Sequence, residues 1–536
     1  MVKTSLFFLS FFLSVVFSFA QQQTYLVQFK DKNSNSFIVD QPADFLSQKA
    51  LKRRSKNTIS INESDLPVTQ VYIDQVVLAG AQLLYPLKWF NGVVVRSDLT
   101  VKSMIASLSF VASVNESVKF RVSNKLSVQS VVQCQSALVD FGSANVQNNM
   151  LGLDVMSSEG YSGKGVFIAV TDDGFLNVDT NPGFASLFLN NQIIDTYDIV
   201  DLDKSVYLQG GGHGAKVFSV IAGELQGQFL APATGSFFSL FRTEDISSES
   251  PLEELNWVRA AEIADSAGVD IIQVSLGYNT FDNSSLNYTW ADLDGNTSYI
   301  SRGAKAAFSK GIIIVASAGN EGSAAWRKIL FPADEPGVVS VGGVDFSETR
   351  APFSSVGNTA DGRLKPDVMA MGLGVTFIEP TGVLNSGSGT SFASPLITGL
   401  LAGLIEAHPG LTYKEIIRSL KKSADRYASP DSLYGYGIPN FKRASNYAHL
   451  LEDKTSCFIF PNPFSAELSV KLPAAYVGSK LVWQLYSING KKIAEQEIVV
   501  DDVVVSLWSS AEGLSAGAYI LKTFIGDDLY TFKIIK

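Results

Sequence analysis

Between about residue 150 and residue 445, short apolar runs alternate with segments whose apolar residues recur every three or four positions. Because the runs are apolar at successive positions, we expect strands that are buried on both faces, as in a parallel sheet covered by helices. We therefore predict an α/β domain whose functional groups lie at the carboxyl ends of its strands. The predicted strands are GVFIAVTD, VDIIQVSLG, GIIIVASAG and VVSVGGV, and the predicted helices are NWVRAAEIADSAG, SRGAKAAFSKG and SFASPLITGLLAGLIEAH.

A different pattern precedes this region. Two strand-like runs within residues 24–39, a helix over 42–57 and further strands over 89–97 and 110–122 predict a small α+β unit. The predicted helix carries a basic cluster of Lys52, Arg53, Arg54 and Lys56, for which a solvated helix face is favoured over a binding patch. Residues 123–150 are polar with few periodic signals, which is typical of a linker.

After residue 450 the pattern changes again, to alternating apolar and polar residues separated by turn signals. Asn489-Gly490 is a strong hairpin turn. Residues 455–536 therefore predict a small all-β module.

The first twenty residues indicate export. A positive start at Lys3, an apolar run and small residues before position 21 are typical of a secretory signal peptide. A membrane anchor is disfavoured because the run is short, and no later run is long enough to span a bilayer, so we expect no transmembrane segment in the mature protein. The chain has 536 residues and a formal net charge of −10, which argues against a nucleic-acid partner.

Cysteine and histidine are rare. The two cysteines, Cys134 and Cys457, exclude a disulfide framework and a Cys-rich metal site, although one disfavoured bridge between them stays open. Of the three histidines, His408 and His449 are expected at the surface, while His213 lies among glycines before an apolar helix. Because glycine lets other chain segments approach closely, His213 is the favoured general base.

Amide hydrolysis also needs an acid that orients the base and donors that hold an oxyanion. Asp172 and Asp173 lie where an apolar run ends, and Asn320 follows another such run among glycines. Each of these signals is weak alone, since acids and amides are common at the ends of strands.

The segment NSGSGTSFASP, residues 385–395, contains four serines before an apolar helix. Pro395 is tolerated only in the first turn of a helix, so we expect the helix to begin near Ser391. A nucleophile at a helix N-terminus gains from the partial positive charge there. Ser391 is therefore preferred over Ser386 and Ser388 in the glycine loop and over Ser394 inside the first turn.

Taken together, these segments resemble the motifs of the subtilases, the subtilisin-like serine proteases. GTSFASP matches their nucleophile motif, AVTDDG resembles the aspartate motif, HGAKVFSVIAG the histidine motif and SAGN the oxyanion segment. The resemblance covers about residues 150–445 and implies that Asp172 orients, His213 transfers the proton, Asn320 stabilises the oxyanion and Ser391 attacks. The strand VSLGY implies substrate binding by Ser275, Leu276 and Gly277. Asp173 and Ala215 depart from the usual pattern, and the extra carboxylate leaves either member of the Asp172–Asp173 pair open.

The outer regions fit the same resemblance. We expect a signal peptide over residues 1–20, an inhibitory pro-domain over 21–130, a catalytic domain over 140–450 and a C-terminal domain over 455–536. The segments FPNPF, SINGKKI, LSAGAYILK and KIIK resemble the sorting domain of the type IX secretion system, with a plain β-sandwich as the alternative. This implies a protein exported through the periplasm, secreted or held at the cell surface, with the secretion machinery as a partner.

The resulting expectation is a secreted serine endopeptidase, made as a self-processing zymogen, that acts on proteins or peptides. An inactive subtilase-fold adhesin is the alternative, and an α/β-hydrolase esterase is disfavoured because the motif lacks its last glycine and the serine comes last. No cofactor is required and no metal ligand is assigned. The family often binds calcium, but a solvated acidic loop is the favoured interpretation of Asp195, Asp198, Asp201 and Asp203.

Overall fold

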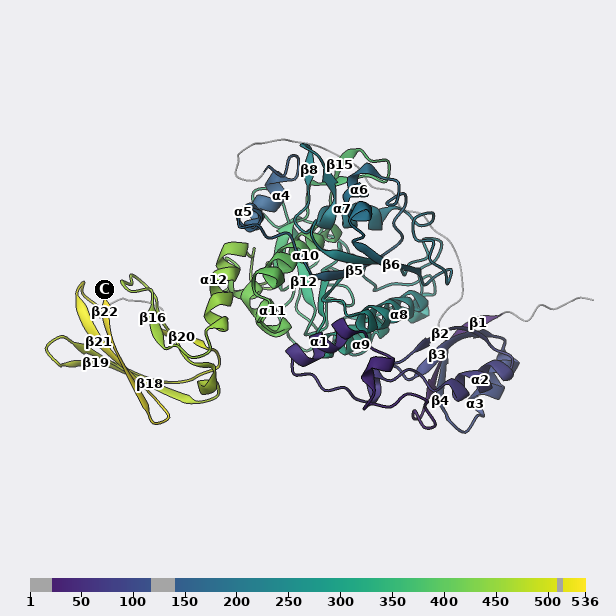
Figure 1. Cartoon of the computed structure of the whole chain (residues 1–536), viewed down its shortest axis with the longest axis horizontal. Coiled ribbons are helices and arrows are strands. Elements are labelled where there is room, and N and C mark those ends of the chain that lie inside the picture. The colour runs from purple at the N-terminus through teal and green to yellow at the C-terminus, as the bar shows by residue number, and fades with distance from the viewer. Residues whose placement is uncertain (1–21, 117–139, 509–513) are drawn as a thin grey trace, which may run out of the picture.

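The computed structural model describes residues 22–116, 140–508 and 514–536. The predicted signal peptide, Cys134 and most of the predicted linker lie outside these residues. The described chain forms a large central unit, with a smaller N-terminal unit on one side and a β module on the other (Figure 1).

The central unit is built on a parallel sheet of seven strands, in the order β13-β12-β11-β10-β5-β9-β6. This confirms the predicted α/β fold class. The apolar runs form its middle because they are buried along their whole length. The strands are β5 (Phe167–Asp172), β6 (Ile193–Asp198), β9 (Phe237–Arg242), β10 (Ile271–Val274), β11 (Ile313–Ser317), β12 (Val339–Val344) and β13 (Val368–Met371).

Helices cover both faces of this sheet. Along β10, Ile271 packs in one hydrophobic cluster with α7 and α10, whereas the next residue, Ile272, packs in another with α8 and α9. The alternation of side chains along a strand thus explains why both faces had to be apolar. The helices of this unit are α4 (Asn145–Met150), α5 (Leu153–Ser158), α6 (Ala185–Leu189), α7 (His213–Ala222), α8 (Pro251–Ala267), α9 (Tyr299–Ser309), α10 (Thr390–Ala407), α11 (Tyr413–Lys422) and α12 (Phe441–Glu452). Two small hairpins complete it, formed by β7 (Glu224–Leu225) with β8 (Phe229–Leu230) and by β14 (Val375–Ile378) with β15 (Leu384–Gly387).

The N-terminal unit is an antiparallel sheet in the order β2-β3-β1-β4. Its elements are β1 (Gln23–Phe29), α1 (Gln48–Lys56), α2 (Gln70–Leu78), β2 (Gln82–Leu87), β3 (Gly92–Ser97), α3 (Leu99–Ala106) and β4 (Val111–Glu116). Tyr25 and Val27 pack with α2 and α3, while Leu26 faces the opposite way and joins the core beside α8 and α9. Residues 36–39, predicted as a second strand, are irregular. Their pattern was too short to distinguish a strand from an extended loop.

The C-terminal module consists of two antiparallel sheets around a core of its own. One sheet pairs β16 (Phe458–Phe460), β17 (Leu468–Lys471) and β20 (Val504–Trp508), and the other contains β18 (Lys480–Ser487), β19 (Lys492–Val499), β21 (Ala518–Ile525) and β22 (Asp528–Ile535). The turn at Asn489-Gly490 joins β18 to β19, as predicted. Buried Asp502 ties the module to the central unit, accepting from Tyr447 at 2.6 Å and pairing with Arg418 at 2.6 Å. Cys457 is a free cysteine.

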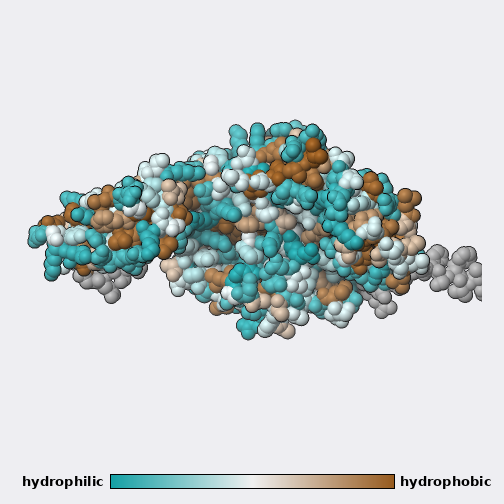
Figure 2. Space-filling view, turned by 90° about the horizontal axis from the view of Figure 1, so that it is seen from below, coloured by the Kyte–Doolittle hydropathy of each residue, from teal (hydrophilic) through white to brown (hydrophobic). Residues whose placement is uncertain are grey.

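The surface seen from below is largely hydrophilic with separate smaller apolar patches (Figure 2). Within the described ranges, α10 is long and apolar enough to cross a membrane, but 83% of its apolar window is buried inside the protein. A core helix of this kind passes the same test of length and composition.

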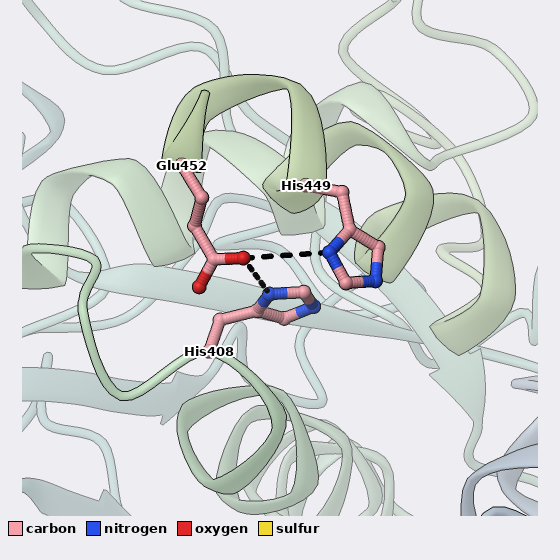
Figure 3. A group of neighbouring side chains, drawn as sticks. All are labelled: His408, His449 and Glu452. Carbon is pink, nitrogen blue, oxygen red and sulfur yellow. Dashed lines mark ion pairs between the residues drawn. The ribbon is translucent and has the colours of Figure 1, made fainter. Parts of the chain in front are cut away.

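His408 corrects the sequence-based prediction, because it is buried and not at the surface. It caps α10, and the chain then turns over Pro409 and Gly410 and packs beneath α12, which covers the imidazole (Figure 3). Burial lowers the pKa of His408. His449, whose ring lies against that of His408, is exposed as predicted.

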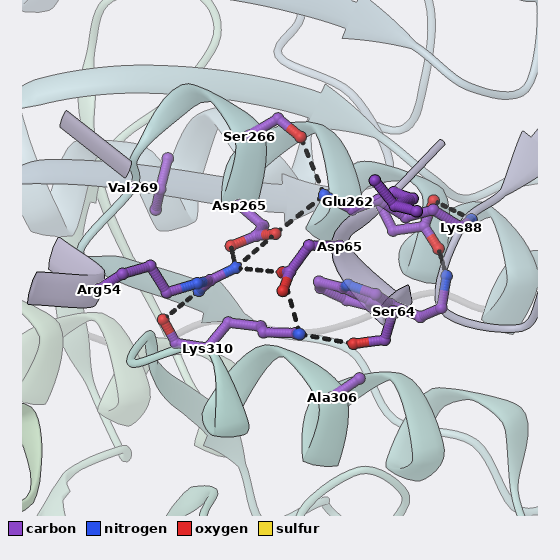
Figure 4. A network of polar contacts seen from close by, with 12 residues as sticks. Arg54, Ser64, Asp65, Lys88, Glu262, Asp265, Ser266, Val269, Ala306 and Lys310 are labelled. Atoms are coloured by element: carbon purple, nitrogen blue, oxygen red, sulfur yellow. Dashed lines mark hydrogen bonds and ion pairs between the residues drawn. The ribbon is translucent and has the colours of Figure 1, made fainter. Parts of the chain in front are cut away.

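The basic cluster of α1 is a second correction in part, because Lys52 and Lys56 are exposed as predicted but the two arginines are not. Arg53 and Arg54 are buried between the N-terminal and central units, and Arg53 pairs with Asp265 of α8 at 2.6 Å. Arg54 pairs with the same carboxylate at 2.9 Å and with Asp65 at 2.8 Å (Figure 4). Lys88 also pairs with Asp265, at 2.9 Å, so one carboxylate receives three cations from the N-terminal unit. The helix pattern had indicated a solvated face because sequence alone does not show that a second unit covers it.

Candidate active site

Three adjacent strands bring candidate residues to one edge of the sheet. Asp172 is the last residue of β5, Ser275 follows β10, and Asn320 follows β11 by three residues. These strands are neighbours and parallel, so their carboxyl ends meet at the same edge. This is the edge at which parallel α/β sheets place their ligands.

His213 is held against Asp172 by the start of α7. It is the first residue of the helix, and its Nδ1 lies 2.7 Å from Oδ1 of Asp172. The following residue has to be small, because a Cβ on Gly214 would stand 2.7 Å from Cβ of Asp172 and 2.4 Å from the Gly174 carbonyl. The glycine after the histidine therefore allows the imidazole and the carboxylate to meet.

The structure distinguishes the two neighbouring carboxylates. Asp172 is fully buried and contacts the imidazole, whereas Asp173 points to the backbone at the start of α7. Oδ1 of Asp173 accepts from the Gly214 N–H at 3.0 Å, and Oδ2 accepts from the His213 N–H at 3.4 Å. Asp173 thus caps the N-terminus of α7. The sequence pattern did not predict this structural role.

The carboxylates set the charge state of the imidazole. Burial alone would lower the pKa of His213, but the charge and hydrogen bond of Asp172, helped by the charge of Asp173, raise it to about 9. Burial, followed by repulsion from Asp172, raises the pKa of Asp173 to about 6. The raised pKa of His213 favours an imidazolium around neutral pH, whereas the raised pKa of Asp173 means that this second carboxylate loses its charge as the pH falls below about 6.

Ser391 lies in the first turn of α10, which begins one residue earlier, at Thr390. Pro395 is consequently the sixth helical residue and not part of the first turn. It has no N–H to donate to the carbonyl of Ser391. The hydroxyl of Ser275 donates to that carbonyl instead, at 2.8 Å, and so repairs the helix at this position.

The other serines of the loop have different surroundings. Ser394 is fully buried and accepts from Nε2 of Gln273 at 2.7 Å. Ser388 is exposed and accepts from the Gly374 N–H at 3.1 Å. Both hydroxyls therefore have structural partners away from the imidazole, which keeps Ser391 as the favoured nucleophile.

Thr390 orients the amide of Asn320. Oδ1 of Asn320 accepts from the N–H and the hydroxyl of Thr390, at 2.9 and 3.1 Å. Nδ2 then faces the space beside Gly389, where an added Cβ would stand 3.0 Å from Oγ of Ser391 and 3.5 Å from this nitrogen. A glycine here keeps the space between the hydroxyl and the amide open. Sequence reasoning did not identify Thr390, although it directly precedes the predicted nucleophile.

The imidazole lies beside the N-terminus of α10. Its ring centre is 5.9 Å from that of Phe392, the residue after Ser391. On the other side it borders a cleft of about 300 Å³, which Leu276 also lines. Most of the remaining lining is acidic, with Asp173, Glu244, Asp245, Glu249, Glu253 and Asp282. Burial, together with repulsion among these groups, raises the pKa of Glu244 to about 8 and that of Glu253 to about 10.

The three predicted substrate-binding residues have distinct positions. Ser275 is buried, and its hydroxyl forms hydrogen bonds with the carbonyl of Ser391 and the hydroxyl of Ser394. Leu276 faces the cleft. Gly277 lies so close to Leu330 that a Cβ would stand 2.7 Å from its side chain. Contact with a substrate by these residues remains a prediction.

The acidic loop after β6 has basic partners. Asp198 is fully buried and, with Asp201, pairs with Arg242 at 2.7 Å, while Asp195 pairs with Lys204 at 2.8 Å. The interpretation as a solvated loop is thus wrong for Asp198. Its partner is the last residue of β9, which is far away in sequence.

Family models match three parts of the chain. Residues 163–437 match the subtilase family, which contains the site just described. The chain belongs to the subtilase family. Over 298 residues it is 30% identical to subtilisin NAT of Bacillus subtilis subsp. natto and 29% identical to subtilisin E of Bacillus subtilis, covering 54% of this chain and 68% of each relative. It is also 30% identical over 368 residues to the human membrane-bound transcription factor site-1 protease, covering 63% of this chain and 31% of that protein. This subtilase is accordingly a serine endopeptidase.

The other two matches identify the outer units. Residues 24–132 match the peptidase S8 propeptide domain of Bacteroidota, and residues 458–536 match the secretion system C-terminal sorting domain. The subtilase is therefore made with a pro-domain and is directed to secretion by its C-terminal module. The contacts of the N-terminal unit described above are therefore those of a pro-domain docked on the catalytic domain of the zymogen.

Proposed function

We propose that this secreted subtilase hydrolyses peptide bonds with Ser391 as nucleophile, His213 as general base and Asp172 as the group that orients it. The observation that carries the proposal is the 2.7 Å contact between Nδ1 of His213 and Asp172, at the sheet edge where Ser391 and Asn320 share one space. Nδ1 donates its hydrogen to Asp172, so Nε2 is the nitrogen that can take a proton.

In the proposed reaction, Oγ of Ser391 attacks the substrate carbonyl carbon while its proton passes to Nε2 of His213. The C–N bond then breaks and the same proton goes to the departing amine. Water then attacks the acyl carbon and gives a proton to His213. The ester C–O bond breaks, His213 returns that proton to Oγ of Ser391, and the acid is released. Buried Asp172 stabilises the imidazolium that forms in each half of the reaction.

The developing oxyanion needs donors that are already in place. The two hydrogen bonds from Thr390 to Oδ1 of Asn320 hold the amide in place. Nδ2 therefore needs little movement to donate to the oxyanion when the negative charge develops. The backbone N–H of Ser391, in the first turn of α10, supplies a second donor together with the positive end of the helix. No cofactor enters this chemistry.

We further propose that the first substrate is the enzyme's own chain. The pro-domain is docked on α8, and residues 117–139 join it to the catalytic domain in the sequence. Cleavage there would separate the two units and would use the same nucleophile as any later substrate.

The test is a serine-specific fluorophosphonate probe combined with N-terminal sequencing. Wild-type protein should be labelled at Ser391 and should lose its pro-domain. The Ser391→Ala variant should do neither in a host without other exported proteases, because removing the nucleophile from a subtilisin lowers kcat about 10⁶-fold.

Ser388→Ala is the matched control and should process normally. Full maturation of Ser391→Ala would show that another protease or another serine makes the cut. Absence of labelling in a folded wild-type protein would favour the alternative, an inactive binding protein.

A further inference from the structure

Two of the three histidines lie together at the opposite end of α10 from Ser391. His408 follows α10, and His449 and Glu452 are three residues apart at the end of α12 (Figure 3). We refer to these three residues as the His/Glu cluster. The spacing of three residues places His449 and Glu452 on the same face of the helix, above His408.

The cluster converges on one carboxylate oxygen. Oε2 of Glu452 lies 3.1 Å from Nδ1 of His408 and 3.3 Å from Nδ1 of His449. The three atoms all lie within 4.8 Å of one another. Tetrahedral Zn²⁺ with bonds of about 2.0–2.2 Å to nitrogen and oxygen separates its ligand atoms by about 3.3 Å. The two distances to Oε2 fit that separation.

The contact between His408 and Glu452 is close, but it lacks the alignment of a regular hydrogen bond. Nδ1 of His408 is buried and, among the described residues, has no partner with hydrogen-bond geometry, although it points at Glu452. The two rings meet edge to face, with centres 4.6 Å apart, and both direct Nδ1 to Oε2 of Glu452. An unpaired nitrogen on a fully buried ring is costly unless something else occupies its lone pair.

The rest of the environment resembles that of a metal ligand. Nε2 of His408 lies 3.0 Å from Oγ of Ser445, which fixes the ring. In the tautomer that carries its hydrogen on Nε2, this nitrogen donates to Ser445 and Nδ1 keeps its electron pair for a metal ion. A hydrogen bond to the second nitrogen is the usual support of a metal-bound histidine. His449 is exposed, so water can reach a fourth ligand position from its side.

We propose that His408, His449 and Glu452 form a binding site for Zn²⁺. Two imidazoles and one carboxylate are a ligand set that suits zinc, whereas calcium and magnesium require mainly oxygen ligands. The ion would join α12 to the loop between α10 and α11. Since the chain enters the sorting domain directly after α12, the ion would brace the point where that domain is attached.

The experiment uses the full chain with Ser391→Ala, which prevents autolysis during long titrations. After treatment with a chelator and its removal, Zn²⁺ is titrated by calorimetry and the melting temperature is followed. We expect binding of one Zn²⁺ per chain, with a rise in Tm of several degrees. His449→Gln and Glu452→Gln should lower the association constant at least tenfold and abolish the rise in Tm. His449 is exposed, so its replacement does not disturb the core.

The matched control is His213→Gln, because Asp172, Asp173 and His213 also bring ligand atoms within 4.8 Å of one another. Binding that survives His213→Gln and is lost with His449→Gln assigns the ion to the His/Glu cluster. Binding lost only with His213→Gln, binding unchanged in both variants, or no stoichiometric binding would overturn the proposal. X-ray absorption of the Zn²⁺-loaded chain should show nitrogen and oxygen ligands at about 2.0–2.2 Å and no sulfur.

Discussion

At the residue scale, the pair Asp172 and Asp173 shows how adjacent identical side chains acquire different tasks. Successive residues at the end of a strand point in opposite directions, so only one can face the imidazole while the other turns to the backbone of α7. Asp173 stays close enough to act through its charge, which contributes to the raised pKa of His213.

This charge predicts the pH dependence of turnover. His213 must be neutral to accept a proton, so kcat/KM should rise about tenfold per pH unit below its pKa of about 9 and level off above it. Asp173→Asn removes a negative charge but keeps an oxygen for the helix cap. The midpoint of the profile should therefore move to lower pH, as measured with a small peptide substrate between pH 6 and 11.

Asp245→Asn is the control, since Asp245 also lines the cleft but is not among the groups that raise the pKa of His213. Its profile should match that of the wild type. An unchanged midpoint in Asp173→Asn would contradict the electrostatic role assigned to Asp173.

Sequence reasoning at this scale identified residue types more reliably than their partners. The motif spacing indicated Asp172, His213, Asn320 and Ser391, and the structure brings them to one edge. It could not predict that Thr390 orients Asn320 or that Ser275 replaces the donor missing at Pro395, because these contacts join segments far apart in the chain.

At the scale of elements, α1 attaches the pro-domain to the catalytic domain through buried ion pairs with Asp265 of α8. Burial alone would raise the pKa of Asp265, but Lys88, Arg53 and Arg54 lower it to about 2. The depressed pKa means that this stabilisation is complete above the normal carboxylate range and is lost as the pH falls towards 2.

Removing the shared carboxylate should therefore destabilise the zymogen. In the Ser391→Ala chain, Asp265→Asn leaves Arg53 and Lys88 without their anion, while Arg54 keeps its pair with Asp65. We expect a loss of about 3–5 kcal/mol in the free energy of unfolding. Denaturant unfolding followed by fluorescence measures it.

Asp270→Asn provides the comparison, because the pair of Asp270 with Lys49 at the same interface is partly exposed and should cost less than about 1 kcal/mol. Equal losses in the free energy of unfolding for the two substitutions would show that the buried ion pairs of Asp265 stabilise the zymogen no more than the partly exposed pair of Asp270.

The apolar strands were predicted well because their burial is intrinsic to the central unit. The buried side of α1 was not predicted, because Arg53 and Arg54 are covered by the central unit, whose residues are far from α1 in the sequence. The periodicity of apolar residues predicts which side of a helix packs on the core of its own unit. It does not predict that a charged side of the helix packs against a second unit.

At the scale of the whole molecule, the three units carry separable tasks. The sorting domain has its own core, and its contacts with the catalytic domain centre on Asp502 and neighbouring Val503. Deleting residues 455–536 should thus leave proteolysis intact while the protein stays in the periplasm. The measurement is the enzyme activity of the periplasmic and culture-medium fractions.

Asp502→Asn in the full chain should loosen the contact but keep the protein in the medium, which separates sorting from docking. Normal appearance of the truncated protein in the medium would contradict the role of the module. The order of the units could be predicted from composition changes and motifs. Their contacts could not, since each depends on single side chains such as Asp502.

The docking of the pro-domain at two places, its sheet on α8 and α9 and its helix α1 beside Asp265, makes it a bivalent ligand. Once the linker is cut, either contact can open while the other keeps the detached piece at a high effective concentration beside its site. Dilution then does little to free the enzyme, because both contacts must be open at the same moment. Under the proposed self-processing, activation then depends on digestion of the detached pro-domain, and its time course should show a lag before the first free molecules degrade the rest.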